Sequence, residues 1–401
     1  MLKLTPSALL LISLPLINFG PIPGGKLTFA HVISFVMLVV WAVRGKLRTR
    51  HQSFGFGLVF LSILTGNVLA GAIRTNNLDQ FTQLLNYGFM MGVMLVAYTL
   101  AMRRDILPLN ILEDYFRLGV IYASISLMLY VVGIFHGDLL YAITDFFNIA
   151  NTFNRGGLSV ELTDALLPRI TGLSPEPSFW SIYLCTVLSV GFLLGRKLWT
   201  PSMLFIALVM LLTIARTGMV VFAFMILYQT YRRAPIAVLL GLCILLIIFF
   251  FNVKFDYTDT DLSIIQRFDS LFDGWNAFLQ SPILGIGWGG FREYSLANNL
   301  DYPLIFNYYL QVAAEGGVVG LVSLLLFLIS LVVNVQRNAR IVLLAIFVAW
   351  LSAPAYNLAY VWYLFGILLA SRQRQLQIHR TLGASISPLF SSSNCHRGVN
   401  F

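Results

Sequence analysis

Apolar runs and shorter polar segments alternate along most of the sequence. Many of the runs contain roughly 20 residues, enough for a helix to cross a hydrocarbon core about 30 Å thick. The pattern predicts an all-α polytopic integral membrane protein with about 12 transmembrane helices. One transmembrane domain would cover residues 1–380. The Ser-rich residues 381–401 have little apolar surface to bury and are predicted to form a disordered cytoplasmic tail.

Two polar segments are much longer than the turns between the other predicted spans. They cover residues 136–176 and 253–306, and we expect both to form large loops on the outer side of the membrane. The apolar run Thr200–Tyr231 is too long for a single span at about 1.5 Å per residue. It is interrupted at Ala215-Arg216-Thr217-Gly218, which predicts two short spans with Arg216 at their outer turn.

Composition and charge support this interpretation and give it an orientation. The chain is 58% hydrophobic and 11% charged, whereas soluble domains carry about 25% charged residues. Most of the 26 Lys and Arg residues fall on one side of the predicted segmentation, and most acidic residues fall on the other. The positive-inside rule then predicts that both termini are cytoplasmic. The net charge of +9 is explained by this topology and does not indicate a nucleic-acid partner.

The second large loop contains an amphipathic segment followed by a cluster of glycines. Apolar residues recur there at helical spacing, which predicts a helix lying in the outer interface with Arg267 near its start. These residues are Ile264, Ile265, Phe268, Leu271, Phe272, Trp275 and Phe278. The glycines between Gly285 and Gly290 allow a tight turn with backbone close to a ligand. Hairpin turns between membrane helices also use glycine, so this cluster alone is weak evidence of a site.

Three charged residues lie at or inside predicted spans, where charge is costly without an anion, a wet cavity or a partner. Arg216 either binds an anion or extends its side chain to the interface. Glu315 lies inside an apolar span and is either functional or structurally paired. Glu176 lies between two prolines at the mouth of a span. This position suits a poorly solvated carboxylate for proton transfer, but it also fits an ordinary helix start.

Four motifs, taken together and in this order, resemble the O-antigen polymerase and O-antigen ligase superfamily of bacterial surface polysaccharide assembly. They are GLSPEPSFW (Gly172–Trp180), TIARTG (Thr213–Gly218), the glycine-bearing segment Arg267–Phe291, and NYYLQVAAEGGVVG (Asn307–Gly320). The motifs lie in the C-terminal part of the chain, and the N-terminal spans match the family in hydropathy alone.

The resemblance implies a metal-independent glycosyltransferase at the outer face of the cytoplasmic, or inner, membrane. Its donor would be an oligosaccharide on undecaprenyl pyrophosphate, and arginines would stabilise the leaving pyrophosphate without a cofactor. A chain-length regulator and other assembly proteins are implied partners, besides membrane lipid. The implied catalytic residues are Glu176, Arg216 and Arg267. The implied substrate-binding residues are Arg169, Trp275, Gly287, Arg292, Asn307, Tyr308 and Glu315.

One position departs from the ligase pattern. Ligases of this superfamily usually carry His-Asn before the tenth span, whereas this chain has Phe306-Asn307. The departure favours a polymerase of O-antigen or exopolysaccharide repeat units, with Glu176 as the candidate acid or base. An O-antigen ligase-type transferase remains an alternative. A lipid-linked oligosaccharide flippase or transporter is less favoured, because neither internal repeats nor charges deep in several spans are evident.

Overall fold

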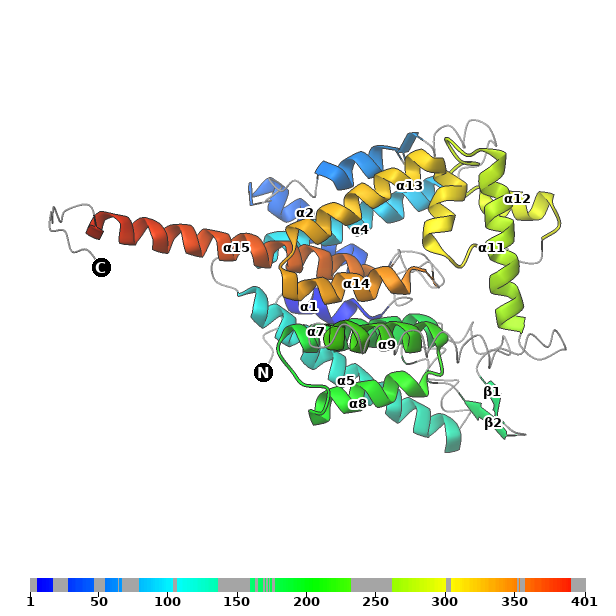
Figure 1. Cartoon of the computed structure of the whole chain (residues 1–401), viewed down its shortest axis with the longest axis horizontal. Helices are drawn as coiled ribbons and strands as arrows, with labels where there is room; N and C mark the ends of the chain where they lie inside the picture. The colour runs from blue at the N-terminus through cyan, green and yellow to red at the C-terminus, as the bar shows by residue number, and fades with distance from the viewer. Residues whose placement is uncertain are drawn as a thin grey trace, which may run out of the picture.

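The fold is a bundle of helices with one short hairpin, seen in a computed structural model (Figure 1). The structure describes residues 6–16, 28–46, 55–63, 65–66, 79–103, 107–135, 159–162, 165–168, 170, 172, 174, 177–231, 262–300, 304–351, 353 and 358–390. The first helices are α1 (Pro6–Ser13), α2 (Phe29–Val43), α4 (Asp79–Ala101), α5 (Pro108–Phe135), α7 (Pro177–Leu193), α8 (Pro201–Leu212) and α9 (Arg216–Tyr231). They are followed by α11 (Leu262–Gln280), α12 (Phe291–Ala297), α13 (Tyr308–Asn334), η2 (Arg337–Ala339), α14 (Arg340–Ala349) and α15 (Ala359–Phe390).

Three of the described helices are long and apolar enough to cross a membrane, judged by length and composition. They contain the spans Leu84–Ala101, Pro108–Val132 and Tyr308–Asn334. Shorter apolar helices are α2, α7 and α8. The helical membrane class is therefore supported, while the predicted total of about 12 spans stays a prediction. The apolar run over residues 234–252, which also predicts a span, lies outside the described residues.

Among the helices that the structure describes, α4 and α15 pack together most extensively. Gly366 of α15 lies against α4 so tightly that an added Cβ would be 2.3 Å from the carbonyl oxygen of Met94. Beyond this contact α15 continues to Phe390, so its last turns reach into the segment 381–401 that the sequence predicts to be disordered. Figure 1 shows this part of α15 projecting from the bundle.

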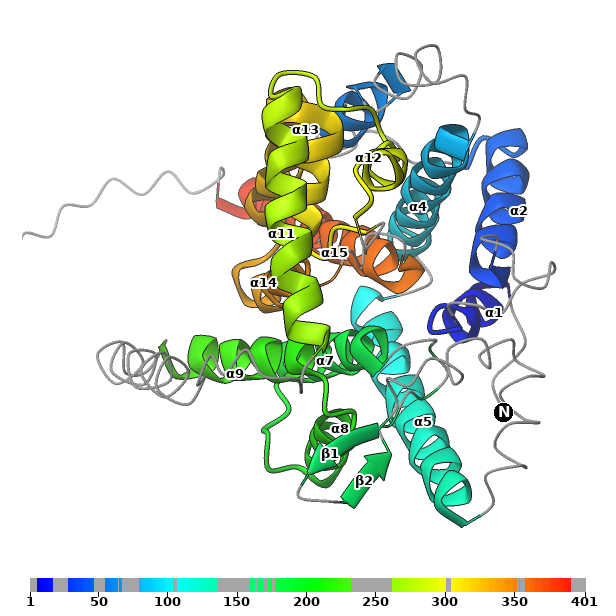
Figure 2. The same ribbon diagram turned by 90° about the vertical axis from the view of Figure 1, so that its right-hand side faces the viewer.

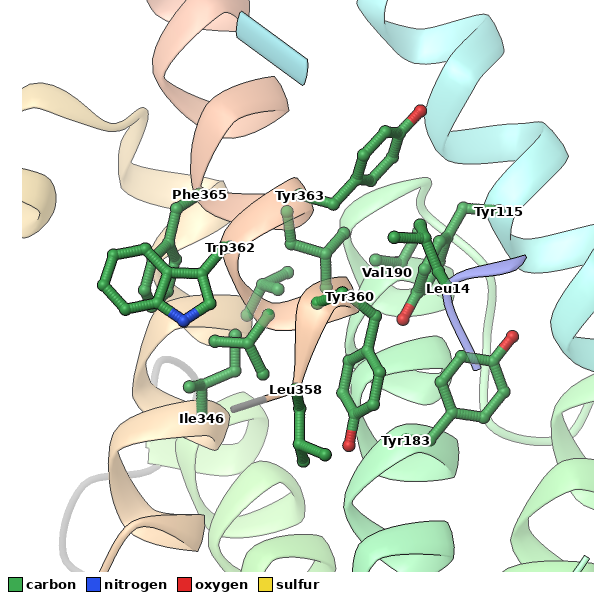
Figure 3. Close-up of a cluster of buried hydrophobic side chains, with 14 of the residues drawn as sticks. Leu14, Tyr115, Tyr183, Val190, Ile346, Leu358, Tyr360, Trp362, Tyr363 and Phe365 are labelled. Carbon is green, nitrogen blue, oxygen red and sulfur yellow. The ribbon is translucent and has the colours of Figure 1, made fainter. Parts of the chain in front are cut away.

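The core between the helices is unusually aromatic. Tyr183 of α7 and Tyr360 of α15 are both buried, with ring centroids 5.2 Å apart (Figure 3). The hydroxyl of Tyr115 is 2.7 Å from that of Thr186, so this buried polar pair is satisfied inside the protein. Burial of such large side chains accounts for much of the stability of the bundle.

Charged residues link several helices at one end of the bundle, which we call the basic end. Glu113 of α5 pairs with Arg196 at 2.7 Å and with Arg117 at 3.1 Å. The guanidinium of Arg374 in α15 donates to the carbonyl of Arg103 at 3.0 Å. These pairings stabilise the charged first turns of α5, which begins at Pro108. A helix tolerates charges in its first turns when each has a partner.

The opposite end carries described parts of the two predicted outer loops, and we call it the loop end. It holds α11, α12 and a hairpin of β1 (Ser159–Leu162) and β2 (Ala165–Pro168) (Figure 1). The strands are antiparallel, with Ser159 opposite Pro168 and Leu162 opposite Ala165. The hydropathy pattern predicts no strands here, because two four-residue segments are too short to give a clear alternation. Figure 2, which faces this end, shows α11 running across it.

Candidate active site at the loop end

Helix α13 is broken at Gly317, close to the loop end. Gly317 has φ 64° and ψ −169°, which is not helical, although the helix continues on both sides. Regions of positive φ with extended ψ are adopted almost exclusively by glycine. The break therefore divides α13 into a short half beginning at Tyr308 and a longer half ending at Asn334.

The loop between α11 and α12 replaces the backbone hydrogen bonds that α13 loses at this break. In a continuous helix, the N–H groups of Val318 and Val319 would donate to the carbonyls of Ala314 and Glu315. Instead these two N–H groups donate to the loop: Val318 N to Pro282 O at 2.8 Å and Val319 N to Ile283 O at 3.3 Å. The two carbonyls accept from the loop in turn: Ala314 O from Ile286 N at 2.9 Å and Glu315 O from Gly287 N at 3.1 Å. The loop and helix are thus locked together by their main chains.

Two glycines make this close approach possible. An added Cβ on Gly317 would lie 2.1 Å from the carbonyl oxygen of Ile283. An added Cβ on Gly285, which has φ 77°, would lie 2.3 Å from the backbone of Glu315. The glycine density noted in the sequence therefore has a packing cause, and Gly287 takes part in it through its backbone N–H.

The carboxylate of Glu315 also takes part in this contact between the loop and α13. Its side chain is buried, and Oε1 accepts a long hydrogen bond of 3.4 Å from the backbone N–H of Phe291, the first residue of α12. The backbone N–H of Gly289 is a second donor, and the Gln311 amide donates to Oε2 at 3.4 Å. Glu315 thus has backbone and amide partners that hold the glycine turn and the start of α12 in place.

Replacing Glu315 with alanine is expected to destabilise the protein, because it leaves the N–H groups of Gly289 and Phe291 without this acceptor. Removing a buried acceptor costs about 1–3 kcal/mol, which should appear as a lower thermal unfolding temperature of the purified protein in detergent. Replacing the exposed Gln280 with alanine is the control and should leave that temperature unchanged. Equal unfolding temperatures for the two variants would contradict this role of Glu315.

Aromatic residues of the bundle pack against the short half of α13. Tyr308 is fully buried, and its hydroxyl is 2.7 Å from that of Tyr87 in α4. Its ring centroid is 4.7 Å from that of Trp350. Trp288 of the glycine turn is also fully buried, 5.3 Å from the Tyr87 ring. Tyr308 therefore lies in the core and positions the start of α13.

Arg267 lies beside the segment that leads into α13. Its guanidinium carbon is 5.3 Å from the centroid of the Phe306 ring, a cation–π distance. Ser270, one turn further along α11, accepts from the backbone N–H of Phe306 at 3.0 Å. Asn307 caps α13, since its side-chain oxygen accepts from Leu310 N at 2.9 Å. Phe306, at the position where the ligases usually carry histidine, is thus held directly against Arg267.

Arg292 lies in α12 with its side chain exposed. The same turn of α12 holds Tyr294, whose ring centroid is 5.7 Å from that of Phe291. Partial burial raises the pKa of Tyr294, and the nearby carboxylate of Asp273 raises it further. Tyr294 therefore stays a neutral hydroxyl at ordinary pH, and Arg292 is the cationic group that α12 presents at this end.

Arg216 is the first residue of α9, and its side chain is exposed. The break between α8 and α9 is stabilised by Thr213, whose hydroxyl accepts from Ala215 N at 3.3 Å. Leu212, at the end of α8, accepts from the N–H of Ile170 at 3.2 Å. Ile170 follows strand β2, which lies at the loop end (Figure 1). Arg216 is therefore at the same end of the bundle as α11 and α12.

The structure assembles part of the predicted site. Arg267 and Asn307 meet around Phe306, while Gly287 and Glu315 meet at the break in α13. Trp275 is half-exposed, on the side of α11 that is directed away from α13. Glu176 and Arg169 lie outside the described residues. Among the residues that the structure does describe, no group of three His, Cys, Asp or Glu side chains is placed to hold a metal ion.

Sequence reasoning did not identify several residues that organise this end. Ser270 and Tyr87 act through hydrogen bonds with partners far away in the sequence, and Gln311 donates to Glu315 one turn further along α13. Ser270 did carry one signal, because it lies with Gly274 and Ala277 on a small-residue strip of α11. Small residues at helical spacing indicate close packing on another helix.

The region of the site matches a known protein family. Residues 201–325, less than half of the chain, match the family model described as O-antigen ligase. The matched part runs from α8 into α13 and so includes Arg216, Arg267, the glycine turn and Glu315. No curated protein matches the sequence. This match, over the region that carries three of the four motifs, supports the resemblance of the chain to the O-antigen ligase and O-antigen polymerase superfamily.

Proposed function

We propose that the protein is a polymerase of O-antigen or exopolysaccharide repeat units in the bacterial inner membrane. It transfers a glycan from undecaprenyl pyrophosphate to a lipid-linked acceptor repeat at the outer face. The match of residues 201–325 to the O-antigen ligase family model supports glycan transfer. The observation that favours polymerisation is that Phe306, and not histidine, lies against Arg267 in front of Asn307.

The proposed reaction is a substitution at the anomeric carbon of the growing chain. A hydroxyl oxygen of the acceptor sugar forms the new glycosidic bond, and the bond from that carbon to the pyrophosphate oxygen breaks. The bonding electrons leave with undecaprenyl pyrophosphate, and the hydroxyl proton passes to a base, for which Glu176 is our candidate. Arg216 and Arg267 stabilise the charge that develops on the leaving oxygen.

Arginine suits this role for a physical reason. Its guanidinium is always charged and presents several donors in a planar fork, which matches the oxygens of a phosphate. Arg267 is half-buried on α11, Arg216 is exposed at the start of α9, and both lie at the loop end. A pyrophosphate carried on a membrane lipid would be held at the level of the interface, where this end of the bundle is proposed to lie.

The surface glycan of cells that lack the protein distinguishes a polymerase from a ligase. Loss of a polymerase should leave single repeat units attached at the cell surface, because attachment continues without chain growth. Gel analysis of extracted glycans from deletion and complemented strains measures this. Polymer accumulating on its lipid carrier without attachment would identify a ligase-type transferase. Single repeats trapped on the cytoplasmic side would identify a flippase.

A further inference from the structure

Helix α11 presents three different strips along its length. Ser270, Gly274 and Ala277 are buried and recur at helical spacing, so they form one strip. A second strip is polar and holds Asp269, Asp273, Asn276 and Gln280. A third strip is apolar and exposed, with exposed fractions of 47% at Phe268, 36% at Leu271, 67% at Phe272, 52% at Trp275 and 55% at Leu279.

The small-residue strip is the side that packs on the protein. An added Cβ on Gly274 would lie 3.0 Å from the side chain of Leu310 in α13 and 3.1 Å from that of Ile305. This arrangement is the reverse of a helix in a water-soluble protein, which turns its large apolar residues toward the core. The large apolar residues of α11 are directed away from α13 instead.

The apolar strip is continuous with a second exposed apolar group at the break in α13. Ile283 and Leu284 follow α11 and have exposed fractions of 67% and 59%. The carbonyl of Ile283 bonds to Val319 N, so this tip is fixed beside α13 at that level. From there α13 itself exposes a run of apolar residues: Val318, Val319, Val322, Leu325, Leu326, Ile329 and Val333.

The continuity of the apolar strip of α11 with the exposed apolar side of α13 indicates what covers the strip. Helix α13 is long and apolar enough to span a membrane, so its exposed apolar side faces lipid chains. The long half of α13, from the break at Gly317 to Asn334, is about the shortest helix that crosses the hydrocarbon core. The tip at Ile283 and Leu284 is therefore at the edge of the hydrocarbon region, and α11 extends from it along the interface.

We propose that the bilayer leaflet at the loop end covers the apolar strip of α11, and that Ile283 and Leu284 form a wedge inserted below it. Large exposed apolar patches rimmed by polar residues mark membrane or protein contacts. An amphipathic helix with one polar and one apolar side lies with its apolar side buried about 5–10 Å into the headgroup boundary. The polar strip of α11 then faces water, and Arg267 is held at a fixed depth. This inference does not depend on the reaction proposed above.

The arrangement predicts an order of depths along the segment. Gly274 lies at the level of Leu310, whereas Ile283 is bonded at Val319, nine residues further along α13. The break at Gly317 lies between these two levels, so Ile283 is bonded to the long half of α13 and Gly274 contacts the short half before the break. We therefore expect Ile283 to be deepest, Phe272 on the apolar strip to be intermediate, and Asn276 on the polar strip to be in water.

Spin labelling of the full chain in phosphatidylethanolamine–phosphatidylglycerol nanodiscs tests this order. Single cysteines at Ile283, Phe272 and Asn276 are introduced after replacement of Cys185, Cys243 and Cys395. All three labelled positions are exposed, so the label should not disturb packing. Collision rates with lipid-soluble oxygen and a water-soluble nickel complex are then measured. Asn276 is the matched control, four residues from Phe272 on the same helix.

We expect the oxygen-to-nickel ratio to be severalfold higher at Phe272 than at Asn276, and highest at Ile283. A ratio at Phe272 equal to that at Asn276 would show that the strip faces water and would overturn the proposal. Low collision rates with both reagents at Phe272, together with dipolar broadening between labels in discs holding two protein molecules, would mean that a second copy covers the strip. That result would also overturn it.

Discussion

Replacing Arg267 with alanine is expected to reduce polymer formation a few hundred-fold while the protein still accumulates in the membrane. Loss of one preorganised charge contact to a developing oxyanion typically costs about 3–4 kcal/mol of transition-state stabilisation. Arg267 is half-buried at the surface of α11, so its truncation removes the charge without opening the core. Glycan length on gels, normalised to protein level in membranes, measures the effect.

Two further variants separate charge from geometry at this position. Arg267→Lys keeps the charge but loses the forked donors, so we expect it to restore little activity. Phe306→Leu keeps Arg267 and removes the ring beneath it, which costs about 0.5–1 kcal/mol at an exposed cation–π site. Its effect should therefore be much smaller than that of Arg267→Ala.

We expect Arg216→Ala to lower activity as strongly as Arg267→Ala. Wild-type polymer lengths from both alanine variants would exclude the proposed pyrophosphate site.

Replacing Gly317 with alanine is expected to prevent the loop end from folding. The new Cβ would lie 2.1 Å from the Ile283 carbonyl oxygen, and φ would remain near +64°, where residues other than glycine are strained. Strain of this kind costs roughly 1–3 kcal/mol, and the clash with backbone cannot be relieved by a rotamer change. Gly285→Ala should behave similarly, since its Cβ would meet the backbone of Glu315.

Gly320 provides a matched control in the same helix. It lies three residues after Gly317, and an added Cβ would be 3.5 Å from its nearest neighbour, an ordinary contact. Gly320→Ala should therefore be neutral or stabilising by up to about 1 kcal/mol, because alanine favours the helix. Membrane abundance and the thermal unfolding temperature measure both variants. Equal behaviour of Gly317→Ala and Gly320→Ala would contradict the interlocked loop.

Much of the helical pattern could be predicted from hydropathy, because long apolar runs have few other solutions in a membrane. The spans within α4, α7 and α13 and the interruption at Arg216 follow from it. The break in α13 could not be predicted, since AEGGVVG is compatible with a continuous helix. The break is stable because residues about 30 positions earlier supply its backbone hydrogen bonds. No local pattern carries that information.

The candidate site was predictable to a similar extent. Arg216 was identified from its setting between two apolar runs, Arg267 from its place on the amphipathic segment, and Arg292 from the family resemblance, and the structure puts all three at the loop end. The role of Glu315 as an acceptor for the glycine turn was not predictable, because its partners are backbone groups. The same holds for Ser270, which contacts the backbone of Phe306 across a chain reversal.

Polymerisation by the purified protein tests the central claim most directly. The protein in nanodiscs is incubated with undecaprenyl-pyrophosphate-linked repeat units and no other protein, and the products are separated by length. We predict a ladder of lipid-linked polymers with release of undecaprenyl pyrophosphate, and no ladder with Arg267→Ala. Release or transfer of single repeats to a different acceptor, with no chain longer than one repeat, would contradict the account.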